Sequence, residues 1–186
     1  MFHATVFAAV LSSFSPLEQP PPLAVADEYI AQDGRRVRWA SVTYTLPDGQ
    51  TAEVVLVADD TASGEGYLFV DGEAIAHSSY DDANGVASWR SSAPGTDALA
   101  GAALVGLSGG AADELLNVFT EGPQEFPCSK WGKKVLRAGK YIWGAMVAAS
   151  AGACCGGTGM AGCGLCSAGG AVLHEAGREA LEGYCD

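Results

Sequence analysis

Residues that favour β-structure, separated by turn signals, predict four short strands in the first half of the chain. The first of these segments is rich in Val, Trp, Thr and Tyr, and Pro47-Asp48-Gly49-Gln50 after it is typical of a tight turn. Asp71-Gly72 is a second, two-residue turn of the kind that closes a β-hairpin. The predicted strands are Arg36–Leu46, Thr51–Ala58, Tyr67–Val70 and Glu73–Tyr80. Short local connections between them indicate an antiparallel β-meander.

Helical patterns follow the polar break at Ser91–Gly95. Thr96 or Asp97 is a suitable cap for an Ala- and Leu-rich helix that runs to about Ser108, and Ala112–Phe119 is a second short helix. Ser129–Ser150 repeats apolar residues at three- and four-residue steps, namely Trp131, Val135, Ala138, Ile142, Met146 and Ala149. Five cations fall within an arc of about 120° beside that apolar stripe: Lys130, Lys133, Lys134, Arg137 and Lys140. We therefore expect a cationic amphipathic helix.

The chain carries no charge from Tyr141 to Leu173, a run of 33 residues. That length exceeds the roughly 20 apolar residues that cross a bilayer. Its apolar content is mostly alanine, however, and nine glycines lie within Gly144–Gly170, each of which weakens a helix interior. We expect a glycine-broken pair of short helices in this region, followed by a surface helix over Leu173–Tyr184.

All six cysteines lie in the last 59 residues, at Cys128, Cys154, Cys155, Cys163, Cys166 and Cys185. An even number of cysteines in a segment too small for a large core predicts a disulfide framework formed outside the cytosol. Adjacent cysteines rarely bond each other, so Cys154 and Cys155 should reach different partners. An alternative is a zinc site built from Cys154, Cys155, Cys163 and Cys166. Spacing alone does not choose the disulfide connectivity.

Charge divides the chain into two parts. The net charge is −12, with fourteen acids against four arginines in residues 1–110 and eight acids against six bases in residues 111–186. Such an acidic chain lacks the clustered cations that nucleic acid binding requires. At the N-terminus, the apolar run Ala4–Leu11 and the small residues Ala24-Val25-Ala26 suggest an export signal with a cleavage site, the alternative being a disordered tail.

These features predict an α+β chain with four segments. Residues 1–26 form a signal or disordered leader, and residues 27–95 form a small antiparallel β domain. Residues 96–127 form a helical linker, and residues 128–186 form a disulfide-stapled, Gly/Ala-rich helical module. The change in character between residues 109 and 127 marks the boundary between the acidic part and the cysteine module.

Few residues have the pattern of catalytic or cofactor-binding groups. His174-Glu175 lacks the second histidine of a metalloprotease helix, and Asp59-Asp60 and Asp81-Asp82 fall in predicted turns where Asp bonds its own backbone. We therefore predict that the chain is not an enzyme and that it binds neither a cofactor nor a metal. Gly109-Gly110 follows leucines spaced like those of double-glycine export leaders, so it is a candidate processing site; we favour the alternative that these residues are the end of a helix that stops at glycine.

Residues 128–186 open with Cys128-Ser129, continue with a basic Ala-rich stretch, and contain Cys166-Ser167-Ala168-Gly169-Gly170 and a cysteine next to the C-terminus. In these features the segment resembles the cysteine-rich microhalocins, bacteriocins of the halocin type that are released from the end of a longer precursor. The chain has fewer cysteines than a typical member. The resemblance implies a secreted antimicrobial peptide, with an N-terminal region that shields it or confers immunity.

The main hypothesis is thus a secreted, membrane-active bacteriocin precursor for defence against other organisms. Its target is a competitor's membrane or an unknown surface receptor, contacted by Lys130, Trp131, Lys133, Lys134, Arg137, Lys140 and Trp143. The acidic N-terminal domain is expected to contact the cationic helix within the same molecule. The alternatives are a secreted or cell-surface binding protein with a structural disulfide module, and a zinc-binding module.

Overall fold

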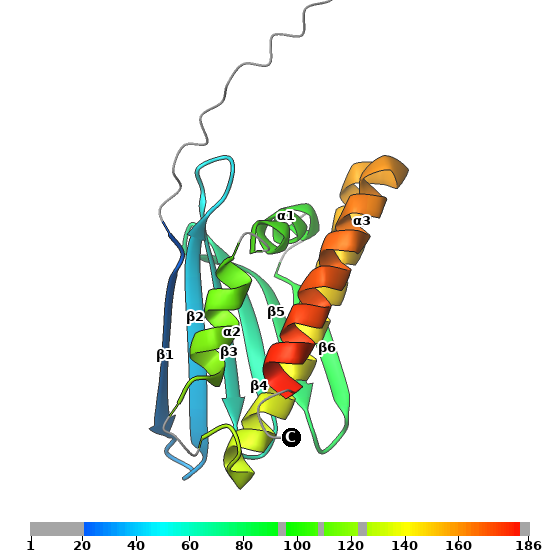
Figure 1. Cartoon of the computed structure of the whole chain (residues 1–186). Helices are drawn as coiled ribbons and strands as arrows, with labels where there is room; N and C mark the ends of the chain where they lie inside the picture. Colours follow the sequence, from blue (N-terminus) through cyan, green and yellow to red (C-terminus); the bar gives the residue numbers. More distant parts are fainter. Residues whose placement is uncertain (1–20, 93–95, 108–109, 123–125, 183–186) are drawn as a thin grey trace, which may run out of the picture.

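The computed structural model describes residues 21–92, 96–107, 110–122 and 126–182; within the last helix the side chains of residues 150, 153, 154, 156–166 and 169 are also outside the description. Six strands form one antiparallel sheet in sequence order (Figure 1). They are β1 (Leu23–Ile30), β2 (Arg36–Thr45), β3 (Thr51–Asp59), β4 (Gly64–Val70), β5 (Glu73–Asp81) and β6 (Val86–Ser91). The predicted α+β class and β-meander are confirmed, and β1 and β6 are additional strands.

The two predicted turns set the register of the central strands. At the first turn Gly49 has φ of 91°, and the Asp48 carboxylate accepts the Gln50 backbone N–H at 3.1 Å. At the second, Asp71 and Gly72 have φ of 50° and 81°. Positive φ at both central residues matches the twist of a β-hairpin, which is why a short polar residue followed by glycine occurs there.

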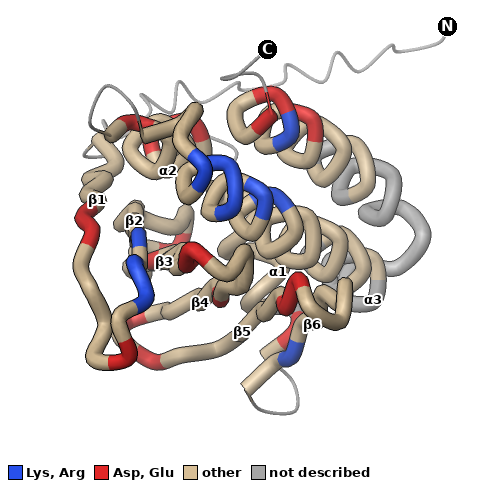
Figure 2. The backbone as a smooth tube through the Cα atoms, turned by 90° about the horizontal axis from the view of Figure 1, so that it is seen from below, with Lys and Arg blue, Asp and Glu red and all other residues tan. Residues whose placement is uncertain are grey.

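Three helices lie on one face of the sheet (Figures 1 and 2): α1 (Asp97–Leu107), α2 (Ala111–Thr120) and α3 (Lys130–Glu182). The first two match the predicted short helices closely. The third folds back on itself, so that residues 130–149 form a first arm and residues 170–182 an antiparallel second arm (Figure 1). The Trp143 indole N–H donates to the Leu173 carbonyl at 2.8 Å, joining the two arms.

One hydrophobic core contains side chains from the sheet and from all three helices. The first arm of α3 approaches the sheet closely at two glycines of β4, because a Cβ added at Gly64 or Gly66 would lie 2.6 or 2.7 Å from Ile142. The sequence led us to expect a cysteine module with little core of its own. Instead, residues 27–95 and 128–182 share this core, because the apolar stripe of the predicted amphipathic helix packs on the sheet.

The predicted leader overlaps the first strand. Leu23–Ala26 pairs with β2 at Thr43–Ala40, and Ala24 and Ala26 pack against the core. A cut after Ala26 would therefore remove the first half of β1.

No single helix among the described residues has the length and apolar content needed to cross a membrane. Leu99–Leu107 and Ala111–Thr120 meet those criteria only as a pair, and the pair is bent by 72°. Both segments contribute buried residues to the core, including Leu104, Leu107 and Leu115.

Candidate functional site

The cationic side of α3 lies against two acidic loops at one end of the sheet (Figure 2). Lys134 donates from Nζ to the Asp60 carbonyl at 2.8 Å, and Arg137 pairs with the Asp82 carboxylate at 3.1 Å. Lys140 pairs with Glu182 of the second arm. The remaining two cations, Lys130 and Lys133, are exposed and make no ion pair with a residue that the structure describes.

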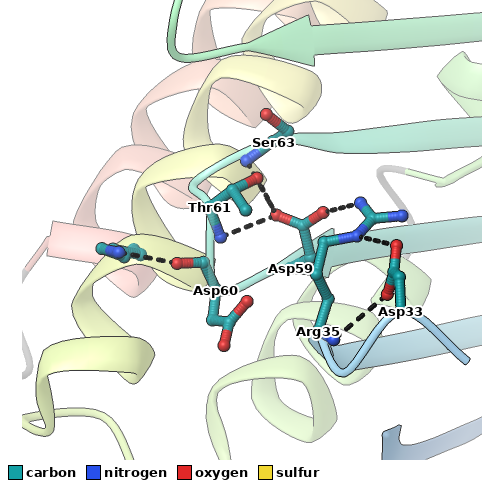
Figure 3. Close-up of polar contacts among 7 residues, drawn as sticks. Asp33, Arg35, Asp59, Asp60, Thr61 and Ser63 are labelled. Atoms are coloured by element: carbon teal, nitrogen blue, oxygen red, sulfur yellow. Dashed lines mark hydrogen bonds and ion pairs between the residues drawn. The ribbon is translucent and has the colours of Figure 1, made fainter. Parts of the chain in front are cut away.

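The loop between β3 and β4 is held by its first aspartate. The nearly buried Asp59 carboxylate accepts the backbone N–H groups of Thr61 at 2.9 Å and Ser63 at 3.2 Å, and it pairs with Arg35 (Figure 3). Arg35 also binds Asp33 at 2.6 Å, and that hydrogen bond lowers the pKa of Asp33. With Asp59 engaged inside the loop, the next residue, Asp60, presents its carbonyl to α3 (Figure 3).

The loop between β5 and β6 repeats this arrangement. The Asp81 carboxylate accepts the Ala83 N–H at 3.0 Å within the loop. Asp82 then accepts the Tyr80 hydroxyl at 2.9 Å and pairs with Arg137, whose pKa it raises. The predicted local bonding of Asp59 and Asp81 is confirmed. The sequence analysis missed that the second aspartate of each pair contacts α3. The available signal was that an Asp-Asp pair occurs where each of two strands ends, at the same end of the sheet.

The apolar side of the same arm is buried. Val135, Ile142, Trp143 and Met146 are at most 1% exposed. In the folded chain the Trp143 ring is 1% exposed and enclosed between the two arms of α3, so the predicted contact of Trp143 with a membrane or receptor is not available in this state. Trp131 is half-buried, with its ring 4.7 Å from Phe126 and the Arg36 guanidinium 4.8 Å from it. Of the seven predicted contact residues, the lysines and Arg137 therefore remain the accessible ones.

The structure describes two of the six cysteine side chains. Cys128, before α3, and Cys155, inside it, are both disulfide-bonded. The Sγ atom of Cys155 lies 3.9 Å from the Ser167 hydroxyl, so it sits where the chain turns from one arm to the other. A disulfide sulfur is not a thiolate ligand, which removes Cys155 from the four-thiol zinc hypothesis. Cys154, Cys163, Cys166 and Cys185 have side chains outside the described part of the chain.

The candidate processing site lies between α1 and α2. Gly109 is outside the described residues, whereas Gly110 precedes α2 with φ of 103°. A cut after Gly110 would leave α2, with its buried Leu115 and Phe119, on the C-terminal fragment.

The opposite face of the sheet is not covered by any described helix (Figure 2). It carries Trp39, Phe69 and a stacked pair, Tyr67 and His77, whose ring centroids are 4.8 Å apart. A hydrogen bond to Glu65 raises the pKa of Tyr67 to about 12. Beside them a cleft of about 910 Å³ is lined by residues that include Tyr29, Arg35, Val57, Glu65 and Val86.

No protein-family model matches the chain, and neither a curated protein nor a solved structure matches it. The activity must therefore be inferred from the residues and contacts of the chain itself.

Proposed function

We propose that the chain is a secreted, bacteriocin-like antimicrobial precursor in which the C-terminal peptide is held inactive by the rest of the fold. The peptide spans residues 128–186 and acts at the membranes of competing microbes. One observation carries the proposal: the cationic amphipathic arm of α3 has its apolar side buried on the sheet and part of its cationic side against acidic loops.

An amphipathic helix binds a membrane surface by inserting its apolar side among the lipid chains while its cations meet anionic headgroups. In the folded chain Lys130 and Lys133 remain exposed, but Ile142, Trp143 and Met146 face the protein interior. Electrostatic attraction to a membrane is thus available before release, whereas insertion is not. The intact chain should accordingly be inactive.

Apolar burial, not charge, supplies most of this masking. Three fully buried side chains of this arm, Val135, Ile142 and Met146, contribute about 1.5–3 kcal/mol each. An exposed ion pair such as Arg137 with Asp82 contributes about 0.2–1 kcal/mol. Release therefore requires a cut in the chain and separation from the sheet, rather than a rise in salt alone.

Disulfides would keep the released peptide in shape once the sheet no longer covers it. Cys128 and Cys155 are already bonded, and we propose that all six cysteines form three disulfides in the exported protein. Each closed loop would contribute about 2–4 kcal/mol by restricting the unfolded chain. That contribution replaces part of the core that the peptide loses on leaving the sheet.

A cleavable variant tests the proposal. A specific protease sequence inserted after Gly122 allows the oxidised full chain to be cut where α2 connects to α3, and dye release from vesicles rich in phosphatidylglycerol reports membrane damage. We expect cutting to raise the rate of dye release at least about tenfold, because it frees the apolar side of the helix. Growth inhibition of related strains should appear with the same cut.

The matched control carries an uncleavable insertion of equal length and should stay inactive under protease. Gel filtration with vesicles present shows whether residues 128–186 have left the sheet. Separated peptide that neither releases dye nor inhibits growth would contradict the proposal, as would an intact chain that is already active.

The inactive outcome would favour the second candidate, a secreted or cell-surface binding protein. The uncovered sheet face, with its aromatic side chains and the 910 Å³ cleft, is the feature that supports this candidate. Deleting residues 122–186 is an unsuitable test of it, because the deletion would expose Val54, Leu56 and Leu68 of the shared core. Substitution of Trp39 or Phe69 on the uncovered face is the suitable change.

A further inference from the structure

The free edge of β1 is the most apolar exposed segment that the structure describes. Four of the eight large hydrophobic residues that are described and exposed lie on this strand: Leu23, Val25, Tyr29 and Ile30, at 68%, 44%, 52% and 62% exposure. No described strand lies outside β1, which forms one border of the sheet (Figure 1). An unpaired edge of this kind is a template for another strand.

The hydrogen bonds already made by β1 and β2 fix which backbone groups face outward. The Ala31 N–H donates to the Arg35 carbonyl, so odd-numbered residues of β1 bond β2. The Asp60 N–H donates to the Arg36 carbonyl, so even-numbered residues of β2 bond β3 and leave the odd-numbered ones for β1. Hydrogen-bonded positions alternate along an antiparallel strand. The backbone groups of Ala24, Ala26, Glu28 and Ile30 therefore point away from the sheet.

We propose that two copies of the chain pair through their β1 strands, antiparallel, and join their sheets into one. A two-fold axis perpendicular to the sheet keeps the helices of both copies on the same side. Facing residues of an antiparallel pair lie on the same side of a sheet. The axis must therefore pass between one residue of β1 and the same residue of the partner copy, and we call that residue the centre of the pairing. The candidate centres are thus single residues of β1.

Ala26 is the centre that suits both the hydrogen bonds and the side chains. Ala26 would exchange two backbone hydrogen bonds with its own copy, and Ala24 would pair with the partner's Glu28. On the uncovered face, Leu23 would lie opposite the partner's Tyr29, at a closely spaced, non-hydrogen-bonded position. Centres at Asp27 or Glu28 would place identical carboxylates opposite each other, and a centre at Val25 would leave Tyr29 without a facing residue in the partner's strand.

Charge regulates this pairing. Asp27 and Glu28 are exposed, the net charge of each copy is −12, and like charges repel across the edge. Asp27 also accepts the Glu28 backbone N–H at 2.8 Å, which occupies one of the outward donors in the single chain. Pairing should thus tighten as salt screens the repulsion. Asp27 weakens the dimer through its charge and through its hydrogen bond to the Glu28 N–H.

Sedimentation equilibrium of the oxidised full chain at low and high salt tests the proposal. We expect a monomer–dimer equilibrium that tightens with salt. The variant Ala26→Pro removes an N–H that β2 does not use, so the sheet can retain its own pairing while the dimer weakens at least about tenfold. The variant Asp27→Ala frees the Glu28 amide and removes two like charges, so it should tighten the dimer several-fold.

Val86→Ser is the matched control, because Val86 is 58% exposed on the opposite edge strand β6. It should leave the dissociation constant unchanged. A wild-type chain that stays monomeric up to about 1 mM, the weak end of specific association, would overturn the proposal. So would a dimer that Ala26→Pro and Asp27→Ala leave unchanged, or one that Val86→Ser weakens as much as Ala26→Pro does.

Discussion

Replacing Trp143 with alanine should lower the free energy of unfolding of the oxidised chain by about 3–5 kcal/mol, the usual cost of truncating a buried aromatic residue. Trp143 is 1% exposed and lies between the two arms of α3. A Cβ added to Gly177 would come within 2.1 Å of its indole nitrogen, which shows how closely the second arm covers the ring. Alanine would leave a cavity that neither arm can fill without moving.

Two further substitutions separate the parts of this effect. Trp143→Phe keeps most of the ring but loses the hydrogen bond to Leu173, so it should cost about 1 kcal/mol plus a smaller packing loss. Val172→Ala changes a residue of α3 that is 68% exposed and should alter stability by less than about 0.5 kcal/mol. Chemical denaturation followed by circular dichroism measures all three. Equal effects for Trp143→Ala and Val172→Ala would contradict the packing described for α3.

Replacing Arg38 with leucine should lower the free energy of unfolding by about 2–4 kcal/mol, because the carbonyl groups at the end of α2 would lose their hydrogen-bond donor. Arg38 is a strand residue that is 4% exposed. Its guanidinium donates to the Phe119 carbonyl at 2.6 Å and the Val118 carbonyl at 2.8 Å, and it also binds the Glu121 carbonyl. The last carbonyls of a helix have no partner within the helix, so this side chain caps α2 from the sheet.

The charge itself is favourable at this position, because the C-terminal end of a helix is the negative end of its dipole. Burial lowers the pKa of Arg38, but a guanidinium stays protonated at neutral pH. Arg38→Lys keeps the charge and loses the planar fork, so its loss of stability should lie between those of wild type and Arg38→Leu. Arg36→Leu is the control on the same strand, because Arg36 is exposed. If the Arg38→Leu protein were as stable as the Arg36→Leu protein, the capping role would be refuted.

Local signals were sufficient for the elements whose ends are set by turn chemistry. Pro47-Asp48-Gly49-Gln50 and Asp71-Gly72 form the turns expected of them, and the helices that begin at Asp97 and Ala111 lie where their sequence patterns predicted them. The first strand was missed because its inward residues, Ala24 and Ala26, are small, so Leu23–Ala26 is apolar on both sides and lacks the alternation of a half-buried strand. The last strand, β6, has few apolar residues in any pattern.

The partner of α3 was beyond what local patterns could show. The apolar stripe through Val135 and Met146 was predicted correctly, but nothing in the stripe specifies what it packs on. The surface on which the stripe packs depends on Gly64 and Gly66, about 80 residues earlier along the chain. Because these residues have no side chains, the helix can approach β4. Pairing between distant segments of this kind is set by shape and becomes visible only in the folded chain.

Native-state amide hydrogen exchange of the oxidised full chain tests the shared core most directly. If α3 is masked by the sheet, buried amides of its first arm, such as those of Val135 and Ile142, should open only with the same free energy and denaturant dependence as Val54 and Leu56 of β3. Exchange of the α3 amides through a lower-energy opening, while β3 stays protected, would show that the helix is an independent unit and would contradict the account.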